Sequence, residues 1–295
     1  MNQKRQNYLG FVLLIQLLLF CAHSIISGVV GAYLGKTASL TASCITVCAV
    51  FALPILYYCK KSGVHLTELL RPKIANDRTR NSQNTVLLFI FAVCMTVTAV
   101  NTVGALCDLV LSFFTSVQGT ENLTAPQLIL MFLRNVLLAS VLEEALFRGV
   151  ILNATDNADI KKRILLSSFI FALAHYSLRA FFYAFAAGII LAYFALKVGS
   201  VAFTVAVHFT QNLITFIFTV LRQFLSDSIF DTASLIVFLV LTAVAIIGAV
   251  YLFLNKKSRL IAPVSKETQK CDTKLFSGEL IAYTILATVL SILIF

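Results

Sequence analysis

Long runs of apolar residues, separated by short polar segments, follow one another along the whole chain. An α-helix rises about 1.5 Å per residue, so about 20 apolar residues are needed to span the hydrocarbon layer of a bilayer. The pattern therefore predicts an all-α fold, a polytopic transmembrane helical bundle of about eight or nine spans. The expected spans are residues 8–34, 39–59, 86–114, 126–152, 163–178, 180–196, 200–221, 234–254 and 275–295.

Composition and charge placement support a membrane protein. Apolar residues make up 59% of the chain and charged residues only 12%, whereas soluble domains carry about 25% charged residues. The net charge of +10 comes from short basic clusters between the apolar runs, which is typical of cytoplasmic loops. A nucleic-acid site would need a continuous basic face, and the sequence shows none.

The basic clusters predict one topology. The N-terminus and the linkers 60–83, 153–163 and 256–274 are expected in the cytoplasm, because these segments hold the lysines and arginines. We expect a multi-pass protein of a bacterial cell membrane. Its domain organisation would be an N-terminal part, 1–125, with the basic linker; a core, 126–222; and C-terminal helices, 223–295.

Polar side chains inside three of the expected spans define the candidate site. Ionisable groups within a membrane span are costly and indicate function by default. Within each of the pairs Glu144/Arg148, Phe171/His175 and His208/Asn212 the residues are four positions apart, so they share one helical face. The candidate catalytic residues are Glu143, His175, His208 and Asn212, and the candidate supporting residues are Glu144 and Arg148.

The depth of these residues in the membrane can be estimated from helical rise. Counted from span ends at 153, 163 and 200, Glu143 lies about 15 Å deep, His175 about 18 Å and His208 about 12 Å. The three helices therefore bring a carboxylate and two imidazoles to a similar level. We expect a cavity that opens to the cytoplasm. Asp108, in contrast, has no partner at a matching depth and is interpreted as structural or as lying near the membrane interface.

These side chains fit two kinds of hydrolytic chemistry. A carboxylate in an apolar site can take a proton from water, and an imidazole can orient that water. A second imidazole and a carboxamide can donate hydrogen bonds to the developing oxyanion. The same set could instead bind catalytic zinc through Glu143, His175 and His208. The residue types alone do not separate these two interpretations, and Glu144 with Arg148 could also be only a structural ion pair.

Three motifs within 126–212 resemble those of a known family. The string from Glu143 to Gly149 resembles the EExxxR motif of the CPBP intramembrane proteases, the ABI or CAAX-protease-like proteins related to type II CAAX prenyl endopeptidase. The segment 171–175 is similar to the family's FxxxH motif and 208–212 to its HxxxN motif. Gly188 also fits the spacing between them.

The resemblance implies an intramembrane endopeptidase with assigned roles. Glu143 would be the general base, His175 would orient the water, and His208 with Asn212 would form the oxyanion site. Glu144 and Arg148 would stabilise the geometry. We favour a site without a cofactor and keep zinc as the alternative, because Asn212 is a poor zinc ligand and the histidines have few side chains nearby to fix their tautomers.

The implied substrate is a peptide or a membrane-anchored protein reached within the lipid bilayer. Two alternatives stay open. The chain could be a non-catalytic bacteriocin-immunity or scaffold protein, or a proton-coupled transporter in which Glu and His form a relay. A transporter would be expected to have helices broken by Gly or Pro at mid-depth.

Overall fold

The computed structural model describes residues 8–72, 85–111, 122–254 and 277–293. All regular secondary structure within these ranges is helical, which confirms the predicted all-α class. The residues 1–7, residues 73–83 of the first basic linker, the loop around Glu121 and the linker 256–274 lie outside the described residues. The cytoplasmic placement of the N-terminus and of the basic linkers stays a prediction, as does the expected placement of the Glu121 loop on the outer side.

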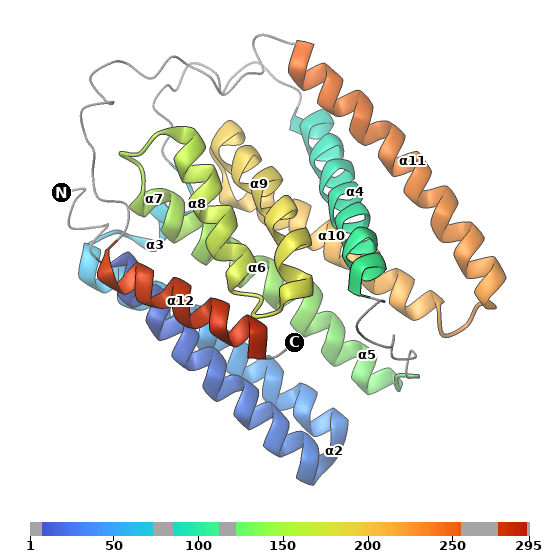
Figure 1. Cartoon of the computed structure of the whole chain (residues 1–295), viewed down its shortest axis with the longest axis horizontal. Coiled ribbons are helices and arrows are strands. Elements are labelled where there is room, and N and C mark those ends of the chain that lie inside the picture. The colour runs from blue at the N-terminus through green and yellow to red at the C-terminus, as the bar shows by residue number, and fades with distance from the viewer. Residues whose placement is uncertain (1–7, 73–84, 112–121, 255–276, 294–295) are drawn as a thin grey trace.

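Figure 1 shows the helices in chain order. Their bounds are α2 Leu9–Ser62, α3 Leu66–Leu69, α4 Thr85–Leu111, α5 Ala125–Met131, η2 Phe132–Leu138, α6 Ala139–Glu144, η3 Ala145–Ile151, α7 Leu152–Ala154, α8 Ile160–Leu173, α9 Leu178–Val198, α10 Val201–Leu221, α11 Asp227–Leu254 and α12 Gly278–Leu293.

The first element, α2, is a helical hairpin whose two arms correspond to the predicted spans 8–34 and 39–59. The backbone leaves the helical conformation at Gly35, where φ is 83° and ψ is 176°, values that a glycine adopts without a steric penalty. The arms then run back along each other, and the Ser39 hydroxyl of the second arm donates a hydrogen bond to the Ser27 carbonyl of the first, at 2.7 Å.

The run from α5 to α7 is one span-length stretch of 30 residues, 125–154. It begins with a capping box in which Thr124 and Gln127 satisfy each other's backbone N–H groups. Two of its five segments, η2 and η3, are π-helical. The hydrogen bond of a π-turn spans one more residue than that of an α-turn. It therefore rotates the side chains that follow it, and such turns are frequent at functional sites. The predicted span 126–152 is confirmed in its extent. The prediction of one continuous α-helix is wrong, because of these two π-helical segments.

The next helix is shorter than expected. A helix over 163–178 was predicted, but α8 has 14 residues and ends at Leu173, so His175 lies in the turn between α8 and α9. The reason is local: Ser177 caps α9 by accepting a hydrogen bond from the Ala180 N–H, with Ser177 itself in an extended conformation. An N-cap residue cannot continue the preceding helix.

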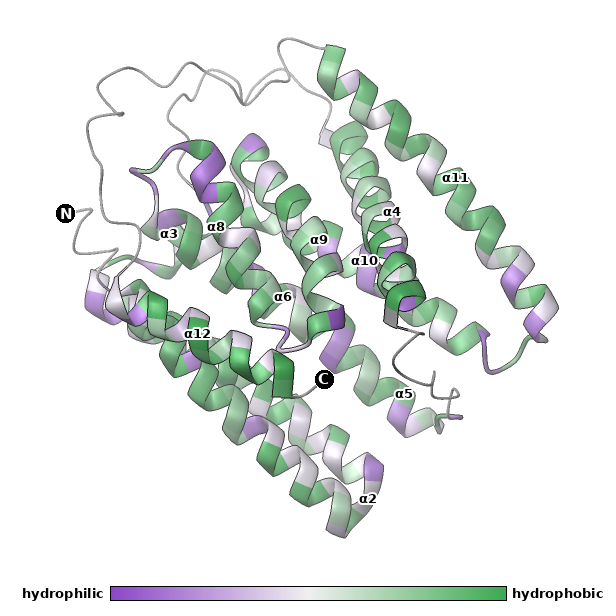
Figure 2. Cartoon of the chain, viewed as in Figure 1, coloured by the Kyte–Doolittle hydropathy of each residue, from purple (hydrophilic) through white to green (hydrophobic). Residues whose placement is uncertain are grey.

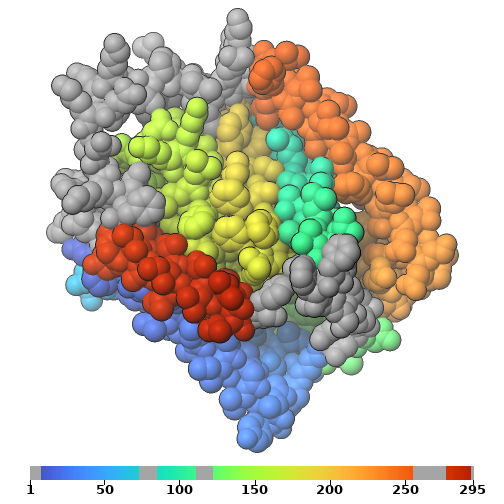
Figure 3. All heavy atoms as spheres, viewed as in Figure 1, coloured from blue at the N-terminus to red at the C-terminus, as the bar shows by residue number. Residues whose placement is uncertain are grey.

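Six helices of the described ranges are long and apolar enough to cross a membrane, with α2 taken as one of them. Large apolar side chains are exposed along their outer faces, and Figure 2 shows hydrophobic residues along most of each helix. These features are those of a multi-pass integral membrane protein. In Figure 3, α12, α8, α9 and α4 lie side by side on one face, with α11 packed against α4 at the edge.

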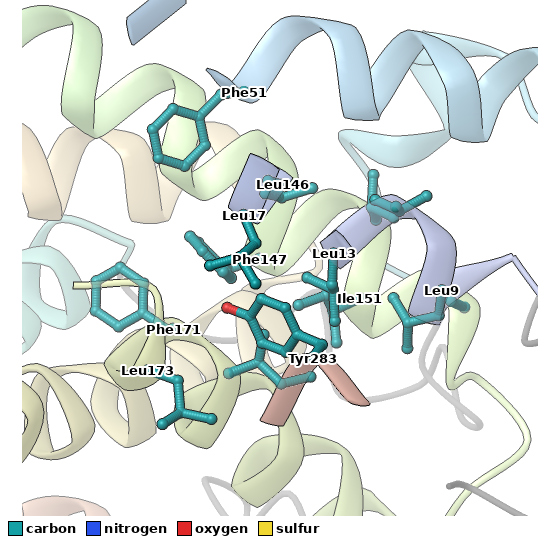
Figure 4. Close-up of a cluster of buried hydrophobic side chains, with 14 of the residues drawn as sticks. Leu9, Leu13, Leu17, Phe51, Leu146, Phe147, Ile151, Phe171, Leu173 and Tyr283 are labelled. Carbon is teal, nitrogen blue, oxygen red and sulfur yellow. The ribbon is translucent and has the colours of Figure 1, made fainter. Parts of the chain in front are cut away.

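The largest buried cluster joins the ends of the chain to its middle. Figure 4 shows Leu13 of α2, Phe147 of η3, Phe171 of α8 and Tyr283 of α12 in this cluster. The helices α8 and α9 also approach closely at Gly188, where an added Cβ would lie 3.0 Å from the Cα of Ser168. This close packing brings the Gly188 backbone within reach of the polar residues described next.

Candidate active site

Phe171 is the aromatic ring on which the three sequence motifs meet. Its buried side chain lies under the Arg148 guanidinium, whose central carbon is 4.3 Å from the ring centroid. The imidazoles of His175 and His208 pack edge-on against the ring, with centroids 4.8 Å and 6.0 Å away. A cation over an aromatic face is attracted by the ring's quadrupole. Phe171 therefore holds one residue from each motif in place.

A buried ion pair lies next to Phe171. Arg148 Nη1 donates to Glu144 Oε1 at 2.8 Å, and neither side chain has any exposed surface. Arg148 Nη2 also donates to the Gly188 carbonyl of α9 at 3.3 Å. His208 Nδ1 of α10 lies 3.1 Å from the same Glu144 oxygen. The ion pair thus connects the run 125–154 to both α9 and α10.

The hydrogen bonds of the two histidines fix their tautomers. His175 Nδ1 is 2.8 Å from the Phe171 carbonyl oxygen, and His208 Nδ1 faces the Glu144 carboxylate. A carbonyl and a carboxylate can only accept, so in both rings Nδ1 carries the proton. In a neutral ring this leaves Nε2 with its lone pair. Both Nε2 atoms can then accept a hydrogen bond from water.

Glu143 is partly exposed, unlike its buried neighbour Glu144. Its carboxylate is close enough to interact electrostatically with Arg148, with Arg134 and with Tyr183 of α9. The Tyr183 ring also lies 6.5 Å from the His175 ring, centroid to centroid. Tyr183 therefore neighbours both candidate catalytic groups. The sequence contained no signal for it, because an aromatic residue in an apolar helix is indistinguishable from a packing residue.

Asn212 is placed differently from the expectation. Its amide nitrogen donates to the Asn135 carbonyl at 2.9 Å and to the Ser140 hydroxyl at 3.4 Å. An amide has two hydrogens, so both donors are engaged in holding α10 against the run 125–154. A role in an oxyanion site requires that one of these bonds be released.

Asp108 was expected to have no partner, and this expectation is wrong. Its carboxylate forms a two-point ion pair with Arg179, with distances of 2.6 and 2.7 Å, between α4 and α9. The two residues are 71 positions apart, so hydropathy could not align them. His23 of α2 is buried and lies beside Thr46 of the opposite arm.

The zinc alternative can be compared with this geometry. Across the described ranges, no group of three or more His, Cys, Asp or Glu side chains is arranged to hold a metal ion, so Glu143, His175 and His208 are not gathered as ligands. One argument against zinc was nevertheless wrong. Both histidines do have groups that fix their tautomers, the Phe171 carbonyl and Glu144, as metal-binding histidines usually have.

The fold and site together define a class: a multi-pass helical membrane protein with a buried carboxylate–arginine–histidine network inside its bundle. Residues 125–214 match the family model described as Rce1-like, type II CAAX prenyl endopeptidase Rce1-like. This segment, from the first residue of α5 into α10, is a CAAX-protease-like domain and includes all three motifs, so the recognised resemblance is confirmed. No curated protein matches the chain, and no solved structure does.

The ion pair gives a prediction about stability. Glu144→Leu leaves the Arg148 charge buried without its partner and should destabilise the protein by about 3–5 kcal/mol, whereas removing both charges costs much less. The double variant Glu144→Leu/Arg148→Met should therefore unfold at a higher temperature than Glu144→Leu alone. Thermal unfolding of the purified variants in one detergent measures this. A double variant less stable than the single one would contradict the pairing.

Proposed function

We propose that the chain is an intramembrane endopeptidase that hydrolyses a peptide bond of a peptide or membrane-anchored substrate by water activation at a Glu/His site. The observation that carries the proposal is the meeting of the three motifs on Phe171, where Arg148, His175 and His208 all contact one ring. The family match of this segment supports an endopeptidase. Hydrogen bonds and ring contacts also link the Glu144–Arg148 pair to both histidines, an arrangement that residues serving only to fill space would not need.

In the proposed reaction, water is bound between Glu143 and the His175 Nε2 lone pair. Glu143 takes one proton from this water while the water oxygen attacks the carbonyl carbon of the scissile bond. The C–O bond forms and the carbonyl electron pair moves onto oxygen, giving a tetrahedral oxyanion. Glu143 then gives its proton to the leaving nitrogen as the C–N bond breaks.

The oxyanion needs hydrogen-bond donors. The Nδ1 proton of His208 is directed at Glu144, so a second proton on Nε2 is needed before His208 can donate to the oxyanion. Asn212 joins when a substrate displaces its bond to Ser140, which at 3.4 Å is the longer of its two. Glu144 and Arg148 keep His208 and Phe171 in place and do not contact the reacting atoms.

The role of Glu143 is tested by Glu143→Gln. The amide keeps the shape of the side chain but cannot take a proton, so turnover should fall by about 10⁴-fold, the upper range for general base catalysis. The assay is cleavage of a fluorogenic peptide library by purified protein in lipid nanodiscs. Glu279→Gln, on α12, is the matched control and should cleave at the wild-type rate. Full activity in Glu143→Gln would refute the proposal.

The metal-free mechanism is tested by chelation. Because the described carboxylates and imidazoles form no three-ligand group, exhaustive dialysis against a strong chelator should leave the cleavage rate unchanged. Loss of activity on dialysis, followed by recovery with one equivalent of zinc, would show that the mechanism is wrong. Glu143, His175 and His208 would then be the first ligands to test.

A further inference from the structure

Tyr176, directly after His175, has an unusual backbone conformation. Its φ is 47°, and it is the one residue other than glycine with positive φ in the described ranges. For a residue with a bulky side chain this left-handed conformation is strained, and such strain persists only where the surroundings hold it. The surroundings of Tyr176 therefore indicate what the strain maintains.

The Tyr176 side chain is held by residues of α2, although Tyr176 itself lies in the turn between α8 and α9. It is only 1% exposed, and its hydroxyl donates a hydrogen bond to Gln16 Oε1 of α2 at 2.7 Å. Its ring also packs against Phe20 of α2, with centroids 4.0 Å apart. Tyr283 of α12 lies close enough to interact with the hydroxyl. The turn after α8 is thus tied to α2 at one end and bordered by α12.

The backbone of the turn connects this anchor to His175. The Tyr176 N–H donates to the Leu173 carbonyl and the His175 N–H to the Ala172 carbonyl, at 3.0 and 3.2 Å. The two neighbouring side chains contact opposite partners: Tyr176 contacts α2, whereas His175 contacts Phe171 and Tyr183. A rotation of the turn would therefore move both rings at once.

We propose that Tyr176 is a positioning residue: its anchored, left-handed backbone holds the His175 imidazole so that Nδ1 donates to the Phe171 carbonyl and Nε2 faces the water of the proposed reaction. The inference rests on the proposed function for its catalytic consequence. The effect of Tyr176 on the tautomer of His175 does not depend on whether the protein is a protease. Through this contact α2, which lies outside the matched segment, contributes to the active site.

The experiment compares Tyr176→Phe, Gln16→Leu and the double variant with wild type. Each single variant removes the same hydrogen bond and should lower kcat about fivefold with KM unchanged, the effect expected for one buried hydrogen bond. The double variant should lose no more than either single one, because the two changes act through one interaction. Tyr33→Phe removes a hydroxyl from an exposed tyrosine of α2 and is the matched control, expected to retain the wild-type kcat.

A spectroscopic measurement separates positioning from general stability. In protein labelled with ¹⁵N-histidine, the nitrogen shifts of His175, assigned through His175→Gln, should report the Nδ1–H tautomer in wild type and a mixture of tautomers in Tyr176→Phe. Gln16→Leu should give the same mixture, which keeps the test valid if Tyr176→Phe folds poorly. Wild-type kcat and an unchanged tautomer in both variants would overturn the proposal, even if both unfold at lower temperature.

The two proposals fail in different ways. If wild type cleaves none of the library but the His175 tautomer changes in both variants, the proposed endopeptidase function is wrong and the positioning of His175 by Tyr176 stands. If wild type cleaves and Glu143→Gln does not, while both anchor variants match wild type in kcat and tautomer, the proposed function stands and the inference about Tyr176 is wrong.

Discussion

The burial of the Glu144–Arg148 pair is the constraint on which the rest of the site depends. Two charged side chains without exposed surface are stable only if their attraction and their remaining hydrogen bonds replace the lost water. Arg148 therefore donates a hydrogen bond to the Gly188 carbonyl and lies over the face of the Phe171 ring. Glu144 also lies within hydrogen-bond distance of His208 Nδ1. The contacts of this one ion pair link α8, α9 and α10 to the run 125–154. Gly188 favours this approach, because even a methyl group there would lie 3.0 Å from Ser168 and the neighbouring helix would have to move.

The arrangement also explains why the matched segment does not act alone. Residues 125–214 contain the three motifs, but the buried cluster next to them includes Leu13 of α2 and Tyr283 of α12. The anchor of the turn after α8, Gln16, belongs to α2 as well. The helices outside the segment thus enclose the site and set the position of the loop that carries His175.

Much of the fold could be predicted from hydropathy, because spans such as α9 and α10 are long apolar runs with clear ends. Helical rise also predicted Glu143 and His208 at a similar level, and the neighbouring Glu144 is the residue that contacts His208. Other features depend on contacts that no local pattern encodes. The π-turns η2 and η3 look like α-helix in sequence, and the Asp108–Arg179 pair joins residues far apart in the chain. Asn212 was assigned an oxyanion-donor role from its carboxamide and its spacing from His208. Its actual partners, Asn135 and Ser140, lie outside its own helix and could not be predicted from that spacing.

Water as the nucleophile is the central claim, and oxygen labelling tests it most directly. A single turnover of wild-type protein with a cleaved peptide, in water enriched in ¹⁸O, transfers the solvent oxygen straight to the new carboxyl group if Glu143 acts as a base. The account predicts one ¹⁸O atom in the product and none in Glu143, measured by mass spectrometry. An unlabelled product, with ¹⁸O found later in the Glu143 side chain, would show that the carboxylate itself attacks the substrate and would contradict the account.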